Sequence, residues 1–134
     1  MLLLSVALCA AAQKPPPQEP PEEDVSLLPK EYAFNPLQAA KEMQVGGFYF
    51  KKGNFKAAAQ RFEEATKWSP QLADAYYRLG EAREKVAEHT KLAKKFDILE
   101  QDQAAAREAW AKFLELAPED KRAPAIRKKL ASKP

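Results

Sequence analysis

Few side chains in this sequence are of the types that perform catalysis or hold metal ions. The chain has one histidine, His89, and one cysteine, Cys9. A zinc or catalytic site needs several His, Cys or carboxylate groups that converge on one point, and His89 has no second histidine or downstream cysteine to accompany it. We therefore expect His89 to be a solvated helix residue.

Two pairs of acids and one pair of glycines have spacings that also occur in active sites. Glu63 with Glu64, and Glu81 with Glu84, are paired carboxylates by spacing alone, and acids on exposed helix faces are usually solubilising. Gly46-Gly47 falls inside a helical pattern, where we expect it to serve helix packing rather than phosphate binding. The sequence thus predicts a protein that is not an enzyme and uses no cofactor or metal ion.

The charge of the chain is unevenly distributed. From Tyr32 onward there are 20 basic and 14 acidic residues, and six of the bases lie after Asp120, where no acid follows. A nucleic-acid binder usually has a stronger basic face with aromatic residues between the bases, so we favour lysines and arginines on solvated helix faces. Binding of nucleic acid or an anionic surface through the basic C-terminus remains an alternative, with strong salt dependence as its mark.

The first twelve residues are apolar apart from Ser5. A helix of this length reaches about 18 Å, which is short of the roughly 30 Å hydrocarbon layer of a bilayer. Ala10 to Ala12 supply an A-x-A cleavage pattern before Gln13. We therefore predict a signal peptide over residues 1–12 and an exported protein that is periplasmic or associated with the outer membrane.

Cys9 leaves a second interpretation of this segment open. It would be the acylated residue of a lipoprotein, although Leu8 is bulky where such sites have a small residue. An uncleaved anchor is a third alternative, and we expect membrane contact only through an N-terminal anchor of one of these kinds. Cleavage at the alanines would leave a mature chain with neither a disulfide nor a thiol-based site.

A proline- and acid-rich segment follows, which we assign to residues 13–33. Five prolines fall between Pro15 and Pro21, and proline fixes φ and removes a backbone donor, so an extended spacer is expected here. Beyond it, Asn35-Pro36 predicts the start of a helix and Gly53-Asn54 its end. A second helix should run from about Phe55 to Trp68, before Ser69-Pro70.

These two helices carry a spaced pattern of small and large residues that occurs twice in the chain. The first copy follows G-x-x-Y, A-x-x-x-F and P. A shift of 34 residues, the period of the tetratricopeptide repeat, leads from Gly46 to Gly80, which Tyr76 and Leu79 precede. The closing half of the second copy, A-x-x-x-W and P, lies further along the chain. The residues expected to pack the repeats are Gly46, Tyr49, Ala58, Phe62, Ala65 and Pro70 in the first copy, and Tyr76, Leu79, Gly80, Ala106, Trp110 and Pro118 in the second.

The sequence therefore resembles the tetratricopeptide repeat family over residues 39–118. The resemblance implies an all-α solenoid of helical hairpins in a domain over residues 34–134, with repeat 1 at about 36–70 and repeat 2 at about 71–118. A capping helix at about 120–131, with Ile126 and Leu130, would cover the last repeat.

The second repeat is longer than the first. Gly80 and Ala106 are 26 residues apart, whereas Gly46 and Ala58 are 12 apart, so about 14 residues extend the hairpin. We expect its tip near Lys94 to Ile98, with Asp97 and Glu100 capping the returning helix. Phe96, Ile98 and Leu99 beside Lys94 and Lys95 then form an apolar cluster rimmed by charge, which predicts that residues 86–103 carry partner specificity. The alternative is that these apolar residues only pack the hairpin against itself.

The resemblance implies protein binding on a concave surface lined by the first helix of each repeat. The residues expected there are Met43, Gly47, Phe50, Lys51, Asp74, Tyr77, Arg78 and Glu81. Met43 and Phe50 have core packing as their alternative role. Met43 and Gly47 also occupy the positions at which related grooves grip a terminal carboxylate, so that mode of binding is not expected.

Lys41 to Ala65 is similar to the repeats of the tetratricopeptide lipoproteins of the bacterial β-barrel assembly machinery, which share a V-G-x-F-Y-x-K-x-G-x-F run. This narrower resemblance implies a scaffold or adaptor of the cell envelope whose partner is another protein, with outer-membrane protein assembly as its context. A self-associating structural protein is the alternative, because two repeats are fewer than the three or more usually needed for stability.

Overall fold

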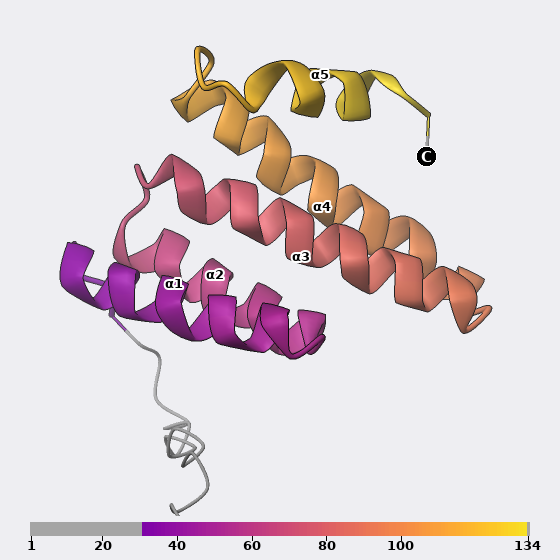
Figure 1. Cartoon of the computed structure of the whole chain (residues 1–134), viewed down its shortest axis with the longest axis horizontal. Helices are drawn as coiled ribbons and strands as arrows, with labels where there is room; N and C mark the ends of the chain where they lie inside the picture. The colour runs from indigo at the N-terminus through magenta and orange to yellow at the C-terminus, as the bar shows by residue number, and fades with distance from the viewer. Residues whose placement is uncertain (1–30, 134) are drawn as a thin grey trace, which may run out of the picture. The chain divides into compact units, whose positions relative to one another are not determined.

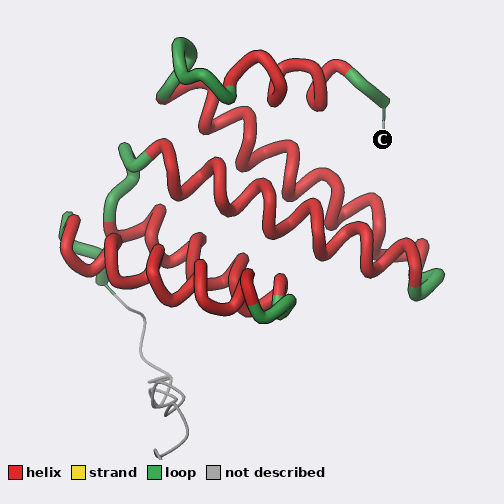
Figure 2. Tube along the Cα trace, in the orientation of Figure 1, coloured by secondary structure: helices red, strands yellow, loops and turns green. Residues whose placement is uncertain are grey.

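A computed structural model describes residues 31–133, so the predicted signal peptide, most of the predicted linker and Cys9 lie outside the described residues. Five helices follow one another within this range: α1 (Pro36–Lys51), α2 (Phe55–Trp68), α3 (Ala73–Leu92), α4 (Phe96–Leu116) and α5 (Ala123–Ala131). Successive helices are joined by short loops, and residues 31–133 contain no strand (Figures 1 and 2). The prediction of an all-α helical repeat is confirmed.

The ends of α1 and α2 lie where the local sequence places them. The Asn35 side chain accepts a hydrogen bond from the backbone N–H of Gln38 at 3.0 Å, and Pro36 takes the first helical position. Gly53 ends the turn after α1 with φ +76°, a left-handed conformation that glycine adopts without penalty. Asn54 then caps α2 by accepting from the N–H of Ala57 at 3.2 Å.

Each repeat places a glycine of its first helix against an aromatic ring of its second helix. A Cβ atom on Gly46 would lie only 2.6 Å from the ring of Phe62, and one on Gly80 would overlap the indole of Trp110. Gly47, by contrast, faces open space, so only the first glycine of the Gly46-Gly47 pair serves helix packing. The same contact in both hairpins supports the alignment of the two repeats.

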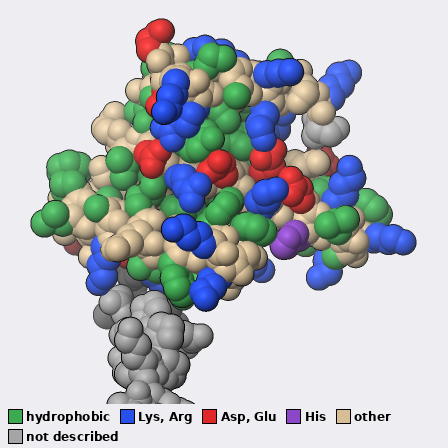
Figure 3. Space-filling view, in the orientation of Figure 1, with side chains coloured by type: hydrophobic (Ala, Val, Ile, Leu, Met, Phe, Trp, Pro, Cys, Tyr) green, Lys and Arg blue, Asp and Glu red, His purple; other side chains and the backbone are tan. Residues whose placement is uncertain are grey.

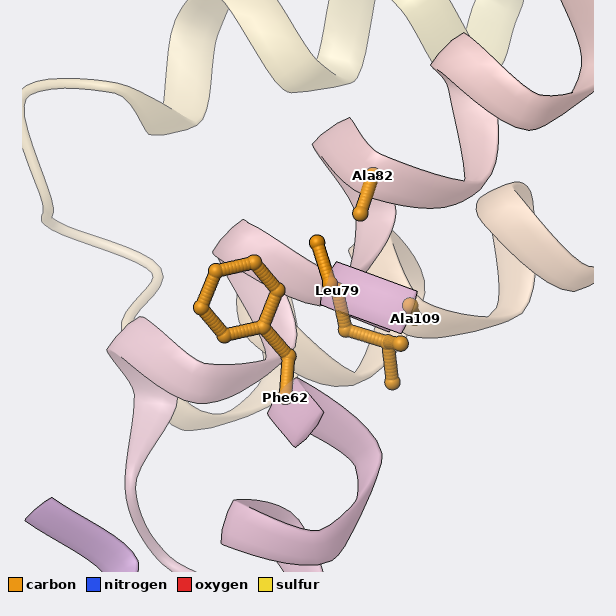
Figure 4. Packing of buried hydrophobic residues seen from close by; sticks show 5 residues of the cluster. Phe62, Leu79, Ala82 and Ala109 are labelled. Carbon is orange, nitrogen blue, oxygen red and sulfur yellow. The ribbon is translucent and has the colours of Figure 1, made fainter. Parts of the chain in front are cut away.

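The apolar core has two parts. The first joins α2, α3 and α4 through Ala58, Phe62, Leu79, Ala82 and Ala109 (Figure 4), and Met43, Tyr49 and Phe50 of α1 pack against it. The second joins α4 and α5 through Trp110, Phe113, Ala123 and Ile126, with Leu130 at its edge. Ile126 is 3% exposed, so α5 covers the end of the second hairpin as a capping helix.

Polar contacts supplement the small apolar face of α5. Arg122 donates to Asp74 at 2.6 Å, and the ammonium of Lys129 lies 2.7 Å from both carboxylate oxygens of Glu84. Arg107 of α4 donates to the carbonyls of Ser132 at 3.2 Å and of Leu130, near the end of α5. Carbonyls in the last turn of a helix have no partner within the helix, so Arg107 caps the C-terminus of α5 from a neighbouring helix.

The second hairpin is longer than the first, as expected, but its turn differs from the prediction. α3 has 20 residues and α4 has 21, against 16 and 14 for α1 and α2. The turn lies at residues 93–95, and Lys95 occupies the N-cap position of α4 without a side-chain cap hydrogen bond. The predicted cap by Asp97 and Glu100 is therefore wrong, because α4 begins at Phe96 and already includes Asp97.

Two further residues lie differently from the sequence pattern. Arg83 stands where the repeat usually has tyrosine, and its guanidinium donates to the carbonyl of Ala105 at 3.1 Å and to Glu63 at 3.2 Å. Tyr32, inside the predicted linker, packs edge-on against Trp68 at 4.8 Å between ring centroids. The described residues include no helix long and apolar enough to cross a bilayer.

Ala58 tests the close approach of the helices in the first repeat. Its side chain is fully buried in the first core. We expect Ala58→Leu to overpack this contact and to lower the free energy of unfolding by roughly 1 to 3 kcal/mol, measured by urea denaturation. Ala57→Leu, on the same helix at a half-buried position, is the matched control and should change stability less. Equal stability of Ala58→Leu and the unmodified chain would contradict the packing described.

Trp110 tests the equivalent contact in the second repeat. Its indole Nε1 is buried and has no hydrogen-bond partner among the described residues, whereas Phe62 fills the same place in the first repeat without a polar atom. Trp110→Phe removes the unpaired donor and keeps most of the ring, so we expect the free energy of unfolding to stay within about 1 kcal/mol. Trp110→Ala should cost about 3 to 5 kcal/mol. A similar loss of unfolding free energy in the two variants would show that the unpaired indole N–H does not destabilise the protein.

Candidate functional site

The residues predicted for the concave surface divide into two groups. Met43 and Phe50 are half-buried and pack against the first core. Part of each side chain therefore contributes to core packing, and only the rest is accessible to a ligand. Lys51 is exposed at the end of α1, and Tyr77, Arg78 and Glu81 are half-buried on α3. The surface presented to a ligand is therefore formed mainly by α3 and the edge of α1.

Arg78 connects three of the predicted residues. Its guanidinium carbon lies 4.8 Å from the ring centroid of Phe50, and one of its nitrogens donates to Glu81 at 2.6 Å. The same group lies 5.3 Å from the ring of Phe62. A guanidinium stacked on aromatic rings and paired with a carboxylate has few alternative rotamers, so the structure brings Phe50, Arg78 and Glu81 together in one ordered group.

Arg122 forms a second group of the same kind, which the sequence pattern did not reveal. Its guanidinium carbon lies 4.2 Å from the ring centroid of Tyr77 and 5.3 Å from that of Phe113. It donates to Asp74 at 2.6 Å and to Asp120 at 2.9 Å. Arg122 precedes α5 and is 45 positions from Tyr77, so no local spacing could have paired them. Its one local signal is the nearby acid Asp120.

The ionisation states in this region are fixed over the physiological range. Hydrogen bonds from the side chain and the backbone N–H of Arg122 lower the pKa of Asp120 to about 2. Asp120 in turn raises the pKa of Arg122 above its usual value. Burial, followed by the nearby charge of Glu81, raises the pKa of Tyr77. These three groups therefore supply permanent charge and a neutral phenol, and none of them exchanges a proton near neutral pH.

The groups considered for catalysis are engaged elsewhere. His89 is exposed, with its ring 5.2 Å from that of Phe55. Glu63 pairs with Arg83, Glu81 with Arg78 and Glu84 with Lys129, so these acids contact bases rather than one another. Glu64 accepts from Tyr32 at 2.6 Å and from Lys67 at 3.1 Å. Over residues 31–133, no group of His, Cys, Asp and Glu side chains is arranged to hold a metal ion.

Two grooves lie beside α4. One has a volume of about 530 Å³ and a wall that includes Glu63, Arg83, Glu108, Lys112 and Glu115. The other has about 260 Å³ and a wall that includes Glu84, Glu88, Lys91, Arg107 and Lys129. Pockets that enclose small molecules are lined mostly by apolar and aromatic groups. The walls of these grooves are mixed, because the charged residues lie beside Tyr76 and Leu79 in the first groove and beside Ala106 and Trp110 in the second.

The end of the long hairpin is a separate exposed surface. We define the hairpin tip as residues 91–98. Phe96 and Ile98, predicted to lie in a recognition patch, are 63% and 40% exposed, and Leu92 is 80% exposed. Leu92 was not predicted to lie in this patch, because the turn was expected further along the chain. Lys91, Lys94 and Lys95 are also exposed, whereas Leu99, predicted beside them, is half-buried.

The turn at the tip has the same backbone hydrogen bonds as the turn of the first repeat, but its residues are less suited to that backbone conformation. The N–H groups of Gly53 and Asn54 donate to Phe50 and Tyr49, and those of Lys94 and Lys95 donate to Lys91 and Thr90, all at 3.0 to 3.1 Å. Lys94 has φ +56° where the first turn has glycine, and a side chain in this conformation costs on the order of 1 kcal/mol. Lys95 replaces the capping Asn54 and supplies no cap.

The strain at Lys94 can be tested by exchanging the residue types at the left-handed positions of the two turns, Gly53 and Lys94. We expect Lys94→Gly to raise the free energy of unfolding by about 0.5 to 1 kcal/mol, because glycine adopts the left-handed conformation without steric penalty. Gly53→Lys should lower it by a similar amount or more. Thermal and urea denaturation of both variants measure these changes, and a Lys94→Gly variant less stable than the unmodified chain would rule out strain at the tip.

Comparison with known proteins gives one match. Residues 46–86, from Gly46 in α1 to Val86 in α3, match the family model of the TPR repeat. No curated protein and no solved structure matches the chain. The matched segment contains the first glycine–aromatic contact, between Gly46 and Phe62, and the glycine of the second contact, Gly80. The match supports the assignment of these repeats to the tetratricopeptide repeat family.

Proposed function

We propose that this protein is a non-catalytic scaffold or adaptor that binds another protein on the surface formed by α1, α3 and the start of α5. Tetratricopeptide repeats generally mediate binding between proteins. The observation that carries the proposal is the pair of stacked arginines, with Arg78 on Phe50 and Arg122 on Tyr77. Arginine and tyrosine are among the residues that contribute most to binding energy at protein interfaces.

The arrangement favours recognition because its side chains are already ordered. The side chains of Arg78 and Arg122 are each 30% exposed, so a partner can reach them, while stacking and ion pairs hold their positions. Ordering a free arginine on binding costs part of the interaction energy. Here both arginine side chains are already ordered in the folded protein, so most of that cost does not arise on binding. Glu81 and Asp74 beside the arginines balance their charge, which suits a partner with both acidic and basic groups rather than a polyanion.

We further propose that the protein acts in the bacterial cell envelope, with outer-membrane protein assembly as its context. The apolar segment 1–12 with its alanine cleavage pattern supports export to the periplasm or the outer membrane, either as a cleaved protein or as one lipid-anchored through Cys9. The proline-rich segment suits a spacer between a membrane and the folded repeats. The resemblance of Lys41 to Ala65 to the lipoproteins of the β-barrel assembly machinery supports the same setting.

Self-association is a second candidate, and one observation favours it. Phe34 and Leu37, at the start of α1, are 72% and 84% exposed, and α1 is the first helix of the array. Apolar residues at the open end of a solenoid can pair with a second copy. Size-exclusion chromatography at two concentrations tests this candidate, because a dimer formed through this end shifts to a smaller size on dilution and a Leu37→Ser variant remains small.

The concave surface is tested by removing its central ion pair. Arg78→Ala with Glu81→Ala should reduce capture of the partner from envelope fractions by about tenfold or more, because the stacked guanidinium is lost. Lys112→Ala with Glu115→Ala is the matched control, since it removes another i, i+3 ion pair from the next helix. Circular dichroism should show both variants folded, and equal capture by the two would refute the assignment of this surface.

A chain in which residues 85–103 are replaced by a short turn separates the two exposed surfaces. Capture that persists in this shortened, folded protein assigns the protein partner to the concave surface. Loss of capture with retained helicity would move the protein-binding site to the hairpin.

A further inference from the structure

The hairpin tip is exposed because the long helices carry it beyond the first repeat. Figure 1 shows α3 and α4 extending past the turn that joins α1 and α2. Phe55 and Phe96 occupy equivalent positions, each at the start of the second helix of a hairpin. Phe55 is covered by the rings of Phe50 at 5.0 Å and His89 at 5.2 Å, whereas Phe96 is 63% exposed. Phe96 belongs to neither of the two core clusters of the described residues.

The apolar side chains of the tip are surrounded by positive charge. Lys91, Lys94 and Lys95 are exposed, and Asp97 is the one acid between positions 91 and 98. Of the flanking acids, Glu88 pairs with Lys85 at 2.9 Å and Asp102 accepts from Thr90 at 2.6 Å, while Glu100 is exposed on the first turns of α4. Figure 3 shows basic and apolar side chains together on the projecting end.

The size of the tip limits what it can bind. Three partly exposed apolar side chains present at most roughly 400 Å², which is well below the about 800 Å² that each partner buries in a standard protein interface. The tip is also convex, since it is the end of a two-helix hairpin. A lipid interface requires neither a large matching area nor a complementary pocket, because acyl chains and headgroups rearrange around the inserted groups.

We propose that the hairpin tip binds the interface of a membrane that contains anionic phospholipids. Leu92 and Phe96 enter the boundary between headgroups and acyl chains, and the lysine side chains extend to the phosphates around them. The left-handed Lys94 fits this role. Glycine would suit the turn better, but lysine places a cation at the outermost point of the hairpin.

Membrane binding at the tip is independent of protein binding on the concave surface. Stable attachment of a peripheral protein commonly requires two signals, and the tip would be the second signal in the two alternatives that keep an N-terminal anchor, lipidation of Cys9 or an uncleaved apolar segment. Protein capture tests the concave surface and vesicle binding tests the tip, so either assignment can fail while the other holds.

The experiment measures flotation of the full chain with vesicles of phosphatidylglycerol and phosphatidylethanolamine, compared with vesicles of phosphatidylcholine. We expect binding to the anionic vesicles that weakens as salt increases. Leu92→Ser with Phe96→Ser should reduce it about tenfold or more. Each of Lys91→Ser, Lys94→Ser and Lys95→Ser should reduce it by up to about fivefold at low salt.

Two control variants test whether binding depends on the tip itself or on any exposed apolar or basic side chain. Phe48→Ser removes another exposed aromatic side chain, on α1, and is the match for Phe96→Ser, and Lys121→Ser with Lys128→Ser and Lys133→Ser removes three exposed lysines from the C-terminal region. Both should keep most of the vesicle binding. Equal losses in either control and the corresponding tip variants would overturn the proposal, as would tip variants that bind like the unmodified chain.

Lys94→Gly distinguishes a binding role from a purely structural one. It should raise the melting temperature and at the same time lower binding to anionic vesicles. A more stable variant with undiminished binding would overturn the role of Lys94. Tip variants that keep vesicle binding but lose protein capture would show that the tip docks on a protein, which also overturns the proposal.

Discussion

The contact of a glycine with an aromatic ring governs the packing of both hairpins. At Gly46 and Gly80 the missing Cβ leaves room for the rings of Phe62 and Trp110, so each pair of helices approaches closely. Alanines such as Ala58 and Ala82 maintain that approach at the neighbouring contacts. The position of Arg78 depends on the same geometry, because its guanidinium stacks on Phe62 as well as on Phe50.

Local signals made much of the fold predictable. Asn35-Pro36 and Gly53-Asn54 set helix ends through hydrogen bonds and dihedral angles that involve only neighbouring residues. The residues of the glycine–aromatic contacts could also be predicted, since Gly80 follows Gly46 by the 34-residue period of the repeat and Trp110 stands in the closing half of the second copy where the first has Phe62. The start of α4 was not, because Lys94 and Lys95 occupy turn positions where glycine and a capping side chain are usual. Because neither residue is typical of such a turn, the local sequence did not indicate where the turn lies.

The candidate site was less predictable for a different reason. Repeat position predicted that Tyr77 and Arg78 lie on the surface lined by the first helix of each repeat, which stays a prediction, whereas the group around Arg122 depends on how α5 returns over the second hairpin. Such contacts join residues far apart in the sequence and are fixed by tertiary packing, which pattern alone does not encode. Leu92 was missed in a similar way, since its exposure follows from the position of the turn.

The long second hairpin leaves the chain with two surfaces of different character. The surface around Arg78 and Arg122 is charge-balanced and ordered by stacking, because each of these arginines has a carboxylate partner. The tip has an excess of lysine over acid and apolar groups without cover in the described chain. Charges that are paired within a protein discriminate between partners by geometry, whereas unpaired charge attracts any surface of opposite sign. The two surfaces share no side chains, so the protein binding proposed for one does not compete with the membrane binding proposed for the other.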